Sequence, residues 1–350
     1  MRKIIKQISI AFLILILISG LSFSQSIDET LSNISSGAVL KYTEPVIDVF
    51  GSSMNSGWFT GLPSATNGIH AKVRIVGVGS FVSGGERNFN YTGAIRLTSG
   101  QVDELITESG LNLTPTEYNT LKSELLSNEW SVTFEGPTII GNLNEHLQVH
   151  FPGTEVQGYN IEPYTLELTD VKGFLNNIDL LPSPALQLDL GSVMGTGVSV
   201  RYFRGINLYD LGVVDVWGLG ILHNFNYWFD DPIPVDIGIG YYFQSFKVGD
   251  IFRNTAFQYG IFISKKIGAL ISFEPYAGLT YETSHSEIDY KYRFDTPAGV
   301  QELKLNVDYQ GDHSANLMLG ASVNLSLFKI NFDYKFGGTR TGTIGVGFGF

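Results

Sequence analysis

From residue 183 to its end, the chain repeats one pattern: segments of about ten residues in which apolar and polar side chains alternate, separated by turn residues. Strict alternation is typical of β-strands with one apolar and one polar face. Between residues 317 and 325 the apolar side chains are odd-numbered, and between 328 and 336 they are even-numbered. Because a shift of one residue inverts the faces of a strand, this change of phase predicts a tight turn near residues 326–328.

The alternation fits either a soluble β-sandwich or a membrane β-barrel, and three features favour the barrel. Phe and Tyr gather on the apolar faces near the strand ends, as in the aromatic girdles of membrane barrels. The opposite faces carry Glu, Lys, Asp and Gly, which suit a wet lumen. The last segment places Phe348 and Phe350 on its apolar face, and this ending resembles the assembly signal of bacterial outer-membrane barrels. We therefore expect Phe350 and Phe348 to be read by the outer-membrane insertion machinery.

The pattern predicts twelve strands, one near residue 75 and eleven at 183–190, 195–203, 210–223, 234–246, 254–265, 269–282, 286–294, 301–309, 315–326, 328–336 and 341–350. An even number lets antiparallel strands close with both chain ends on one side. One or two further pairs between residues 84 and 160 would raise the count, and fourteen is the leading alternative. The expected fold class is all-β: a transmembrane antiparallel β-barrel of about 12–14 strands.

The N-terminus predicts a secretory signal peptide over residues 1–24. Three basic residues precede a nearly continuous apolar run at 8–18, and small residues at positions 22 and 24 predict cleavage before Gln25. A single membrane anchor is the alternative, but the run is shorter than the ~20 residues that a spanning helix needs. Together with the barrel pattern, the leader predicts a bacterial outer-membrane location, in contact with the lipid bilayer.

Two helical regions interrupt the β pattern. Residues 25–68 are expected to form an N-terminal helical, plug-like segment, with apolar residues at three- and four-residue spacings up to Phe50 and an interruption at Pro45. This segment could plug the lumen or lie against the periplasmic rim, and the sequence leaves both open. Residues 98–128 predict a small helical insertion with a capping box from Thr114 to Glu117. The barrel is assigned to residues 69–350.

Charge and composition exclude several function classes. Lys and Arg number 22 against 34 for Asp and Glu, a net charge of −12. Without the three basic residues of the leader the balance is 19 against 34, a net −15. So acidic a chain lacks the clustered Lys and Arg with which proteins bind nucleic acid. The absence of Cys excludes disulfides, thiolate zinc sites and Cys nucleophiles.

No catalytic, cofactor or metal site is expected, because the six His residues lie in no convincing catalytic arrangement. The Ser284-His285-Ser286 cluster reads as a solvated turn, and the surroundings of His146 and His150 argue against a helix that would align them on zinc. Two residues remain as weak candidates for the lumen or a ligand. Arg201 alternates with apolar neighbours, and His223 lies close to two Trp residues.

The chain resembles a bacterial outer-membrane β-barrel family of unknown function (DUF6588-like), related in layout to the long-chain fatty-acid outer-membrane transporters. The matching stretches are Tyr42, Pro45, Asn-Ser-Gly-Trp at 55–58, Pro-Thr-Ile-Ile-Gly at 137–141, 195–202, 218–223, Trp228, 232–236 and Tyr242. They span most of the chain beyond the leader. The helical insertion at 98–128 departs from this pattern. The resemblance implies membership of a barrel family and no chemistry.

The leading interpretation is a non-enzymatic, porin-like outer-membrane channel or transporter, with hydrophobic small molecules as candidate solutes. In transporters of the fatty-acid type, a segment analogous to 25–68 plugs the lumen from the periplasmic side. The alternative is a structural or surface-interaction barrel that binds a partner through its loops.

Overall fold

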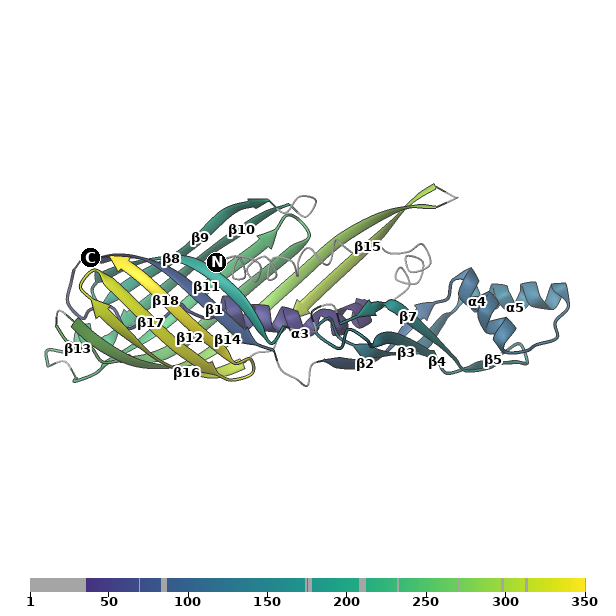
Figure 1. The fold of residues 1–350 in the computed structure, drawn as a ribbon, viewed down its shortest axis with the longest axis horizontal. Helices are drawn as coiled ribbons and strands as arrows, with labels where there is room; N and C mark the ends of the chain where they lie inside the picture. Colours follow the sequence, from purple (N-terminus) through teal and green to yellow (C-terminus); the bar gives the residue numbers. More distant parts are fainter. Residues whose placement is uncertain are drawn as a thin grey trace.

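Ten antiparallel strands close into a barrel in the computed structural model, and a smaller folded unit stands at one end of it (Figure 1). The structure describes residues 36–68, 70–82, 87–173, 175, 178–207, 212–231, 233–269, 271–296, 299–311 and 314–349. The predicted signal peptide at 1–24, the first part of the predicted plug-like segment and Phe350 therefore lie outside the described residues.

The barrel strands follow one another around the wall, and β1 pairs with both β8 and β18 to close the ring at the chain's start and end. Between them, β12 pairs with β14, and the remaining neighbours pair in sequence order. The ten strands are β1 (His70–Phe81), β8 (Leu180–Val193), β9 (Thr196–Asn207), β10 (Val213–Asn224), β11 (Asp236–Val248), β12 (Phe252–Ser264), β14 (Ile271–Thr296), β16 (Ser314–Leu325), β17 (Phe328–Phe336) and β18 (Thr341–Gly349).

The ring therefore has ten strands, fewer than the 12–14 expected, while the predicted fold class is confirmed. The segments predicted at 269–282 and 286–294 are one continuous strand, β14. The segment predicted at 301–309 is β15 (Gly299–Gln310), which pairs only with the outer half of β14. This hairpin extends beyond the barrel wall (Figure 1).

The miscount at β14 has a physical cause. In its first half the odd-numbered side chains, such as Leu279, face outward, and the even-numbered ones, such as Glu282, are buried in the lumen. Farther along, the buried even-numbered residue is apolar: Ile288 packs with Ile47 and Val307. The apolar side chains of β14 thus change from odd-numbered to even-numbered positions, because the outer half of the strand packs against α3. A change of parity is also what a turn would produce.

Large apolar side chains on the outward faces of the barrel strands are exposed. On β17, Ile330 and Phe332 face outward, with Phe332 58% exposed, while Asn331 and Asp333 are 1% and 2% exposed. This alternation confirms the predicted faces, and the turn between β16 and β17 has Ser326 in the left-handed region at φ 57°. We call the outward set the apolar belt: Val73, Ile75, Leu186, Leu188, Leu190, Val198, Leu219, Ile221, Ile239, Tyr241, Tyr259, Ile261, Ile263, Phe273, Leu279, Leu317, Leu319, Val323, Ile330, Phe332, Ile344, Val346 and Phe348.

Residues 87–172 fold into a separate unit, which we call the inserted unit, between β1 and β8. Its strands are β2 (Asn88–Arg96), β3 (Glu129–Pro137), β4 (His146–Phe151) and β7 (Tyr164–Lys172), with a hairpin of β5 (Thr154–Val156) and β6 (Tyr159–Ile161). Its helices are α4 (Ser99–Glu108) and α5 (Pro115–Ser127). They pack on the sheet around a core that includes Leu105, Leu121, Leu125, Val132 and Phe134.

The predicted helical insertion at 98–128 matches α4 and α5 closely. Both helices begin with a capping box, Thr98 with Gln101 and Thr114 with Glu117, which satisfies two backbone N–H groups at each helix start. The strands expected between residues 84 and 160 exist, but they pair in the sheet of the inserted unit and not in the barrel. The alternative prediction of fourteen barrel strands was therefore wrong.

Helix α3 (Ser36–Met54) connects the inserted unit to the barrel. Ala38 belongs to the core of the inserted unit, whereas Ile47 and Val49 pack at the barrel's mouth. The helix continues through Pro45, where an interruption was expected. Proline in a helix interior costs about 3 kcal/mol, and packing on both sides offsets that cost here. In the part of the chain that the structure describes, no helix has the length and apolar character needed to cross a membrane.

The two ends of the barrel differ. At the end away from the inserted unit, β8 joins β9 and β16 joins β17 through two-residue turns, Met194-Gly195 and Ser326-Leu327, whereas residues 225–235 join β10 to β11. At the other end the chain inserts the whole of the inserted unit between β1 and β8 and extends the β14–β15 hairpin (Figure 1). Membrane barrels typically have short turns on the periplasmic side and longer loops outside.

Phe332→Arg tests the outward assignment. An Arg on the lipid face near mid-membrane should destabilise the refolded barrel by about 2–4 kcal/mol, measured by urea unfolding in lipid vesicles. A Cys at position 332 should be quenched by lipid-borne quenchers. A Cys at position 331 should respond neither to these quenchers nor to aqueous thiol reagents, because Asn331 is buried. Lipid quenching at 331 but not at 332 would contradict the assignment.

Candidate functional site in the barrel lumen

Residues 55–68, which we call the lumen segment, follow α3 through the interior of the barrel. Along its path the segment contacts successive wall strands: Ser322 donates to the carbonyl of Thr60 at 2.9 Å, and Asn224 donates to that of Pro63 at 2.8 Å. At the far end, Gly68 and Ser192 exchange two backbone hydrogen bonds. The segment therefore crosses from the end that carries the inserted unit to the end where β1 begins.

Basic side chains of the wall donate to carbonyls at the end of α3 and in the lumen segment. Arg74 Nη2 donates to the carbonyl of Trp58 at 2.7 Å, and Arg201 Nη2 donates to that of Ser56 at 2.9 Å. Lys335 Nζ donates to the carbonyl of Ser52 at 3.2 Å, in the last turn of α3. The last carbonyls of a helix lack intrahelical partners and carry the negative end of its dipole, so cations suit this position.

Two adjacent aromatic residues fill the centre of the lumen. Trp58 stacks on Tyr242 with ring centroids 5.3 Å apart, and the Arg201 guanidinium lies 3.8 Å from the Trp58 ring. Phe59 stacks on Phe262 at 4.4 Å and meets Tyr276 edge-on at 5.2 Å. Aromatic pairs contribute about 0.5–1.5 kcal/mol each beyond area burial, and a desolvated cation–π contact about 2 kcal/mol.

Glycine at two positions makes this packing possible. Gly57 has φ 74°, and a Cβ there would come within 2.6 Å of the Val76 side chain. On the wall, a Cβ at Gly218 would lie 2.8 Å from the Trp58 ring. Gly57 and Trp58 belong to the 55–58 stretch that carried the family resemblance, and Gly218 begins another such stretch. Those stretches therefore include residues that fit the lumen segment to the wall.

Three ion pairs lie among the charged side chains of the lumen wall. Lys335 lies 2.6 Å from Glu282, and Lys329 lies 3.1 Å from Glu274. Arg74 pairs with Asp189, whose other oxygen accepts from Gln187 and Ser199. Removing one partner of a buried ion pair typically costs about 3–5 kcal/mol, because it leaves an uncompensated charge. The pairs therefore fix which wall strands face one another around the lumen segment.

A cavity of about 100 Å³ lies beside the last turn of α3. It is lined by Asp48, Gly51, Ser52, Asn55, Glu282, Thr283, Ser284, Ser314, Gly338 and Thr339. Pockets for drug-sized ligands have volumes of about 300–1,000 Å³. The predicted lumen for hydrophobic solutes is thus filled by the protein's own chain, and its wall is largely polar.

The residues predicted from the sequence are placed as follows. Arg201 is in the lumen, 2% exposed, and holds Ser56 and Trp58. His223 shares the outward parity of Ile221, so a lumen role was wrong for it; its ring nitrogens hydrogen-bond Thr196 and Trp228 at the rim. Phe348 is exposed on the outward face of β18, and Phe350 lies outside the described residues.

The other His clusters form ordinary contacts within their sheets. His285 lies within β14, where a solvated turn was expected, near Glu287 on the same strand and Asp308 on β15. His146 and His150 lie on β4 and contact carboxylates from neighbouring strands. Among the residues that the structure describes, no three His, Asp or Glu side chains are grouped to hold a metal ion.

Sequence reasoning missed the residues that hold the lumen segment. The sequence assigned no individual role to Arg74 or Lys335, and Trp58 entered only as part of the 55–58 stretch that carried the family resemblance. The sequence feature that could have identified them is a basic residue on an inward face of small and polar side chains. Such a residue must find a partner when water is excluded.

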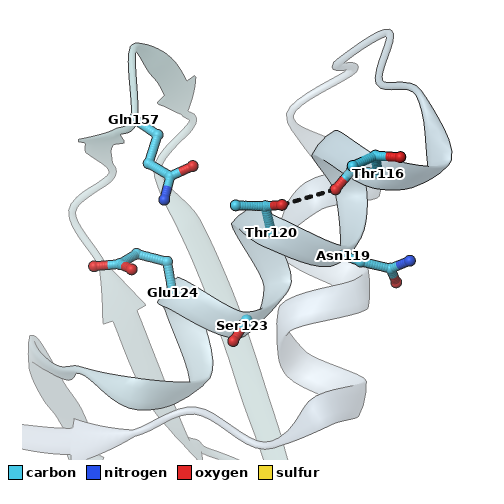
Figure 2. Close-up of a pocket in the computed structure, with 6 residues that line it drawn as sticks. All are labelled: Thr116, Asn119, Thr120, Ser123, Glu124 and Gln157. Atoms are coloured by element: carbon cyan, nitrogen blue, oxygen red, sulfur yellow. Dashed lines mark hydrogen bonds between the residues drawn. The ribbon is translucent and has the colours of Figure 1, made fainter.

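A groove of about 450 Å³ lies on the inserted unit, between α5 and the β5–β6 turn (Figure 2). All its lining residues are polar: Thr116, Asn119, Thr120, Ser123, Glu124 and Gln157. Gln157 has φ 52° and is followed by Gly158 at φ 81°. Residues 87–172 hold four Lys and Arg against twelve Asp and Glu, a net charge of −8. The inserted unit is therefore an acidic body with a polar groove.

A carboxylate joins the two helices of the inserted unit. Asp103 on α4 accepts hydrogen bonds from Lys122 and Tyr118 on α5. The Lys122 contact, with that of Tyr118, holds the pKa of Asp103 below its ordinary value of 3.8. The pKa of Glu117 is also lowered, chiefly by the hydrogen bond from its capping partner Thr114. Hydrogen bonds to the charged form explain both shifts.

The fold and the lumen define a class: a closed antiparallel barrel with an apolar exterior and a lumen filled by its own chain. The chain belongs to the family described as "Family of unknown function (DUF6588)", whose model matches residues 1–350. No curated protein matches the sequence.

Solved outer-membrane barrels resemble the structure only distantly. OmpT of Vibrio cholerae is 10% identical with a TM-score of 0.25, covering 81% of this chain and 99% of its own. The β domain of the Bordetella autotransporter BrkA is 9% identical with a TM-score of 0.28, covering 81% and 99%. Ail of Yersinia pestis is 13% identical with a TM-score of 0.21, covering 44% and 97%. These likenesses assign no function, and the link to fatty-acid transporters is not shown.

Arg201→Ala tests whether Arg201 fixes the position of the lumen segment. The change removes hydrogen bonds to Ser56, Gln187 and Gln244 and the contact with Trp58, so the free energy of unfolding should fall by about 3 kcal/mol. Urea unfolding of the refolded protein measures it. Arg204→Ala is the matched control, because Arg204 is largely exposed and its ion pair with Asp215 is long, at 3.8 Å. This change should alter the free energy of unfolding by less than ~0.5 kcal/mol. Equal effects would contradict the assigned role.

Acid should loosen the α4–α5 pair. Because the pKa of Asp103 is lower in the folded state, its stabilisation is present above the unfolded pKa and is lost as the pH falls through the folded value, below 3.8. Pepsin cleavage of the α4–α5 connection in the full chain should therefore accelerate below this pH. Asp103→Asn should flatten that acid dependence, with Glu108→Gln on the same helix as control. An unchanged pH profile in the Asn variant would count against the assignment.

Proposed function

We propose that this protein is a non-enzymatic outer-membrane barrel that is closed by its own N-terminal segment and presents the inserted unit to a partner at the cell surface. The filled lumen is the observation that carries the proposal. A channel needs a continuous path, and here Trp58, Phe59 and the hydrogen-bonded carbonyls of Ser56 and Trp58 occupy it. The alternative drawn from the sequence, a surface-interaction barrel, therefore fits better than the transporter.

The apolar belt supports the membrane location. Soluble monomers rarely expose contiguous apolar patches beyond a few hundred Å², whereas this belt encircles ten strands. A spanning β-strand needs about 9–11 residues, and the two shortest barrel strands, β17 and β18, have 9 each. The predicted signal peptide and the predicted assembly signal at Phe350 and Phe348 complete the proposal of export and insertion by the outer-membrane machinery.

The inserted unit supports the surface-interaction role. It has its own core, extends beyond one end of the barrel and holds the polar groove of about 450 Å³ (Figures 1 and 2). With a net charge of −8 it favours a partner that offers basic groups to Glu124 and its hydrogen-bonding neighbours.

Gated passage of a polar solute is the second candidate. Among the described residues, Arg74 Nη1 and both amide atoms of Asn331 are buried in the wall without a hydrogen-bond partner. Unpaired buried polar atoms are costly and are usually satisfied by water. A shift of the lumen segment would expose this polar wall, which suits hydrophilic solutes and not hydrophobic ones.

Conductance in planar bilayers separates the two candidates. The unaltered protein should insert without steady ion conductance, because the lumen segment blocks the path. Trp58→Ala combined with Phe59→Ala should produce conducting events, since it removes the two side chains at the centre of the lumen.

Trp217→Ala combined with Phe243→Ala is the matched control, because this aromatic pair, 4.8 Å apart, lies on the outward face of neighbouring strands. A heat-modifiable band in gel electrophoresis shows that each variant has folded. Steady conductance of the unaltered protein would overturn the closed-barrel proposal.

A further inference from the structure

A row of charged side chains crosses the outer face of the barrel at the end that carries the inserted unit. We call it the charged row, and each member lies directly opposite the next on the neighbouring strand: Arg204, Asp215, Lys247, Arg253, Glu287 and Asp308. Asp215 shares the outward parity of Trp217, and Arg253 shares that of Tyr259. The row therefore lies on the face that carries the apolar belt, one residue before β11 ends and one residue after β12 begins.

Aromatic side chains lie between the charged row and the aliphatic part of the apolar belt. Two residues along β10 from Asp215, Trp217 lies opposite Tyr202, and both are exposed on the outward face. The next step holds Phe243 and Phe257, with ring centroids 5.0 Å apart, and the step after it holds Tyr241, Tyr259 and Tyr281. Aromatic residues form such girdles where a barrel meets the membrane–water interface. Because two residues of a strand span about 7 Å, the charged row lies at the depth of the lipid headgroups.

The two cations at the centre of the charged row face each other. Lys247 on β11 lies directly opposite Arg253 on β12, and like charges in this arrangement destabilise a sheet. The acids beside them compensate only in part, because Asp215 pairs with Arg204 at 3.8 Å and Glu287 pairs with Arg253 at 3.7 Å. Within the described part of the chain, Lys247 has no ion pair of its own. An anion held between Lys247 and Arg253 would remove their repulsion.

We propose that the charged row binds the phosphate group of an anionic lipid, with Lys247 and Arg253 as its two donors. A guanidinium offers several N–H groups to phosphate oxygens, and an ammonium adds a mobile point charge. The side chain of Arg253 is 49% exposed and that of Lys247 is partly exposed, so both can reach a headgroup. The acids on either side restrict the site to this central pair. The inference rests on the membrane location in the proposed function and adds a lipid partner to it.

Lipid retention by the full chain tests the inference. The protein is refolded into vesicles of equal parts phosphatidylcholine and phosphatidylglycerol, and the lipids that remain bound in detergent are counted by native mass spectrometry. The unaltered protein should retain phosphatidylglycerol in preference to phosphatidylcholine. Lys247→Gln combined with Arg253→Gln should reduce this preference roughly 25-fold, since each Lys or Arg near an anionic lipid surface contributes about fivefold to binding. The charge-conserving exchange of Lys247→Arg with Arg253→Lys should preserve it.

Lys265→Gln combined with Lys266→Gln is the matched control. Both Lys side chains are exposed, follow β12 at the opposite end of the barrel and carry the same total charge as the central pair. The control should keep the lipid preference of the unaltered protein. Equal losses in the two double variants would indicate general attraction to a charged surface and would overturn the inference. Equal retention of both lipids by the unaltered protein would overturn it as well.

A heat-modifiable band confirms the folding of each variant. If the variant at positions 247 and 253 lacks this band, each single change is measured instead and should reduce the preference about fivefold. Failure of the unaltered protein to enter vesicles would overturn the membrane location, and the inference with it. Steady conductance with an intact lipid preference would overturn only the closed barrel and would leave the lipid site standing.

Discussion

The contact of two wall guanidinium groups with the backbone of the lumen segment is the interaction on which the rest depends. Arg74 and Arg201 donate to carbonyls two residues apart in that backbone, and Arg201 also lies against Trp58. Once the segment excludes water, every charge on the inward face must find a partner, because an isolated buried charge is far too costly. Three of the wall's acids accordingly pair with cations, and Asp333 accepts hydrogen bonds from Thr343 and Tyr276. A buried ion pair adds little net stability, so these pairs act here by selecting one position of the lumen segment.

The alternation of apolar and polar side chains predicts much of the barrel, but it does not predict the number of strands. Alternation reports which face of a strand is apolar, but not whether lipid or protein covers that face. In β14 the outward face is apolar beside Leu279, and the inward face is apolar at Ile288, where α3 lies beneath. The same pattern hides β15, whose alternation is that of a barrel strand although it joins no barrel neighbour except β14. The helices of the inserted unit were predictable because their caps are local: Thr114 and Glu117 satisfy each other within one turn.

The candidate site could be predicted only in part. The alternation of side chains along a strand places Arg201 inward. Because residues two apart share a face, the same alternation places His223 on the outward face with Ile221. The lumen segment has no periodicity to read, because its conformation is set by contacts with strands far along the chain. Trp58, for example, is held by Tyr242 and fits against Gly218, and both of these partners lie more than a hundred residues away. Such a segment resembles a loop until its surroundings are known.

Helix α3 makes the inserted unit and the lumen segment parts of one continuous element. Its first turns are tied to the inserted unit through Tyr42, its middle to the β14–β15 hairpin through Asp48, and its last turn to the wall through Ser52. An α-helix of 19 residues is about 28 Å long and resists stretching, since each turn is held by backbone hydrogen bonds. Displacing the lumen segment therefore requires either that the inserted unit moves with α3 or that the helix breaks. Pro45 is the weakest point for such a break, because it removes one backbone hydrogen bond from the helix.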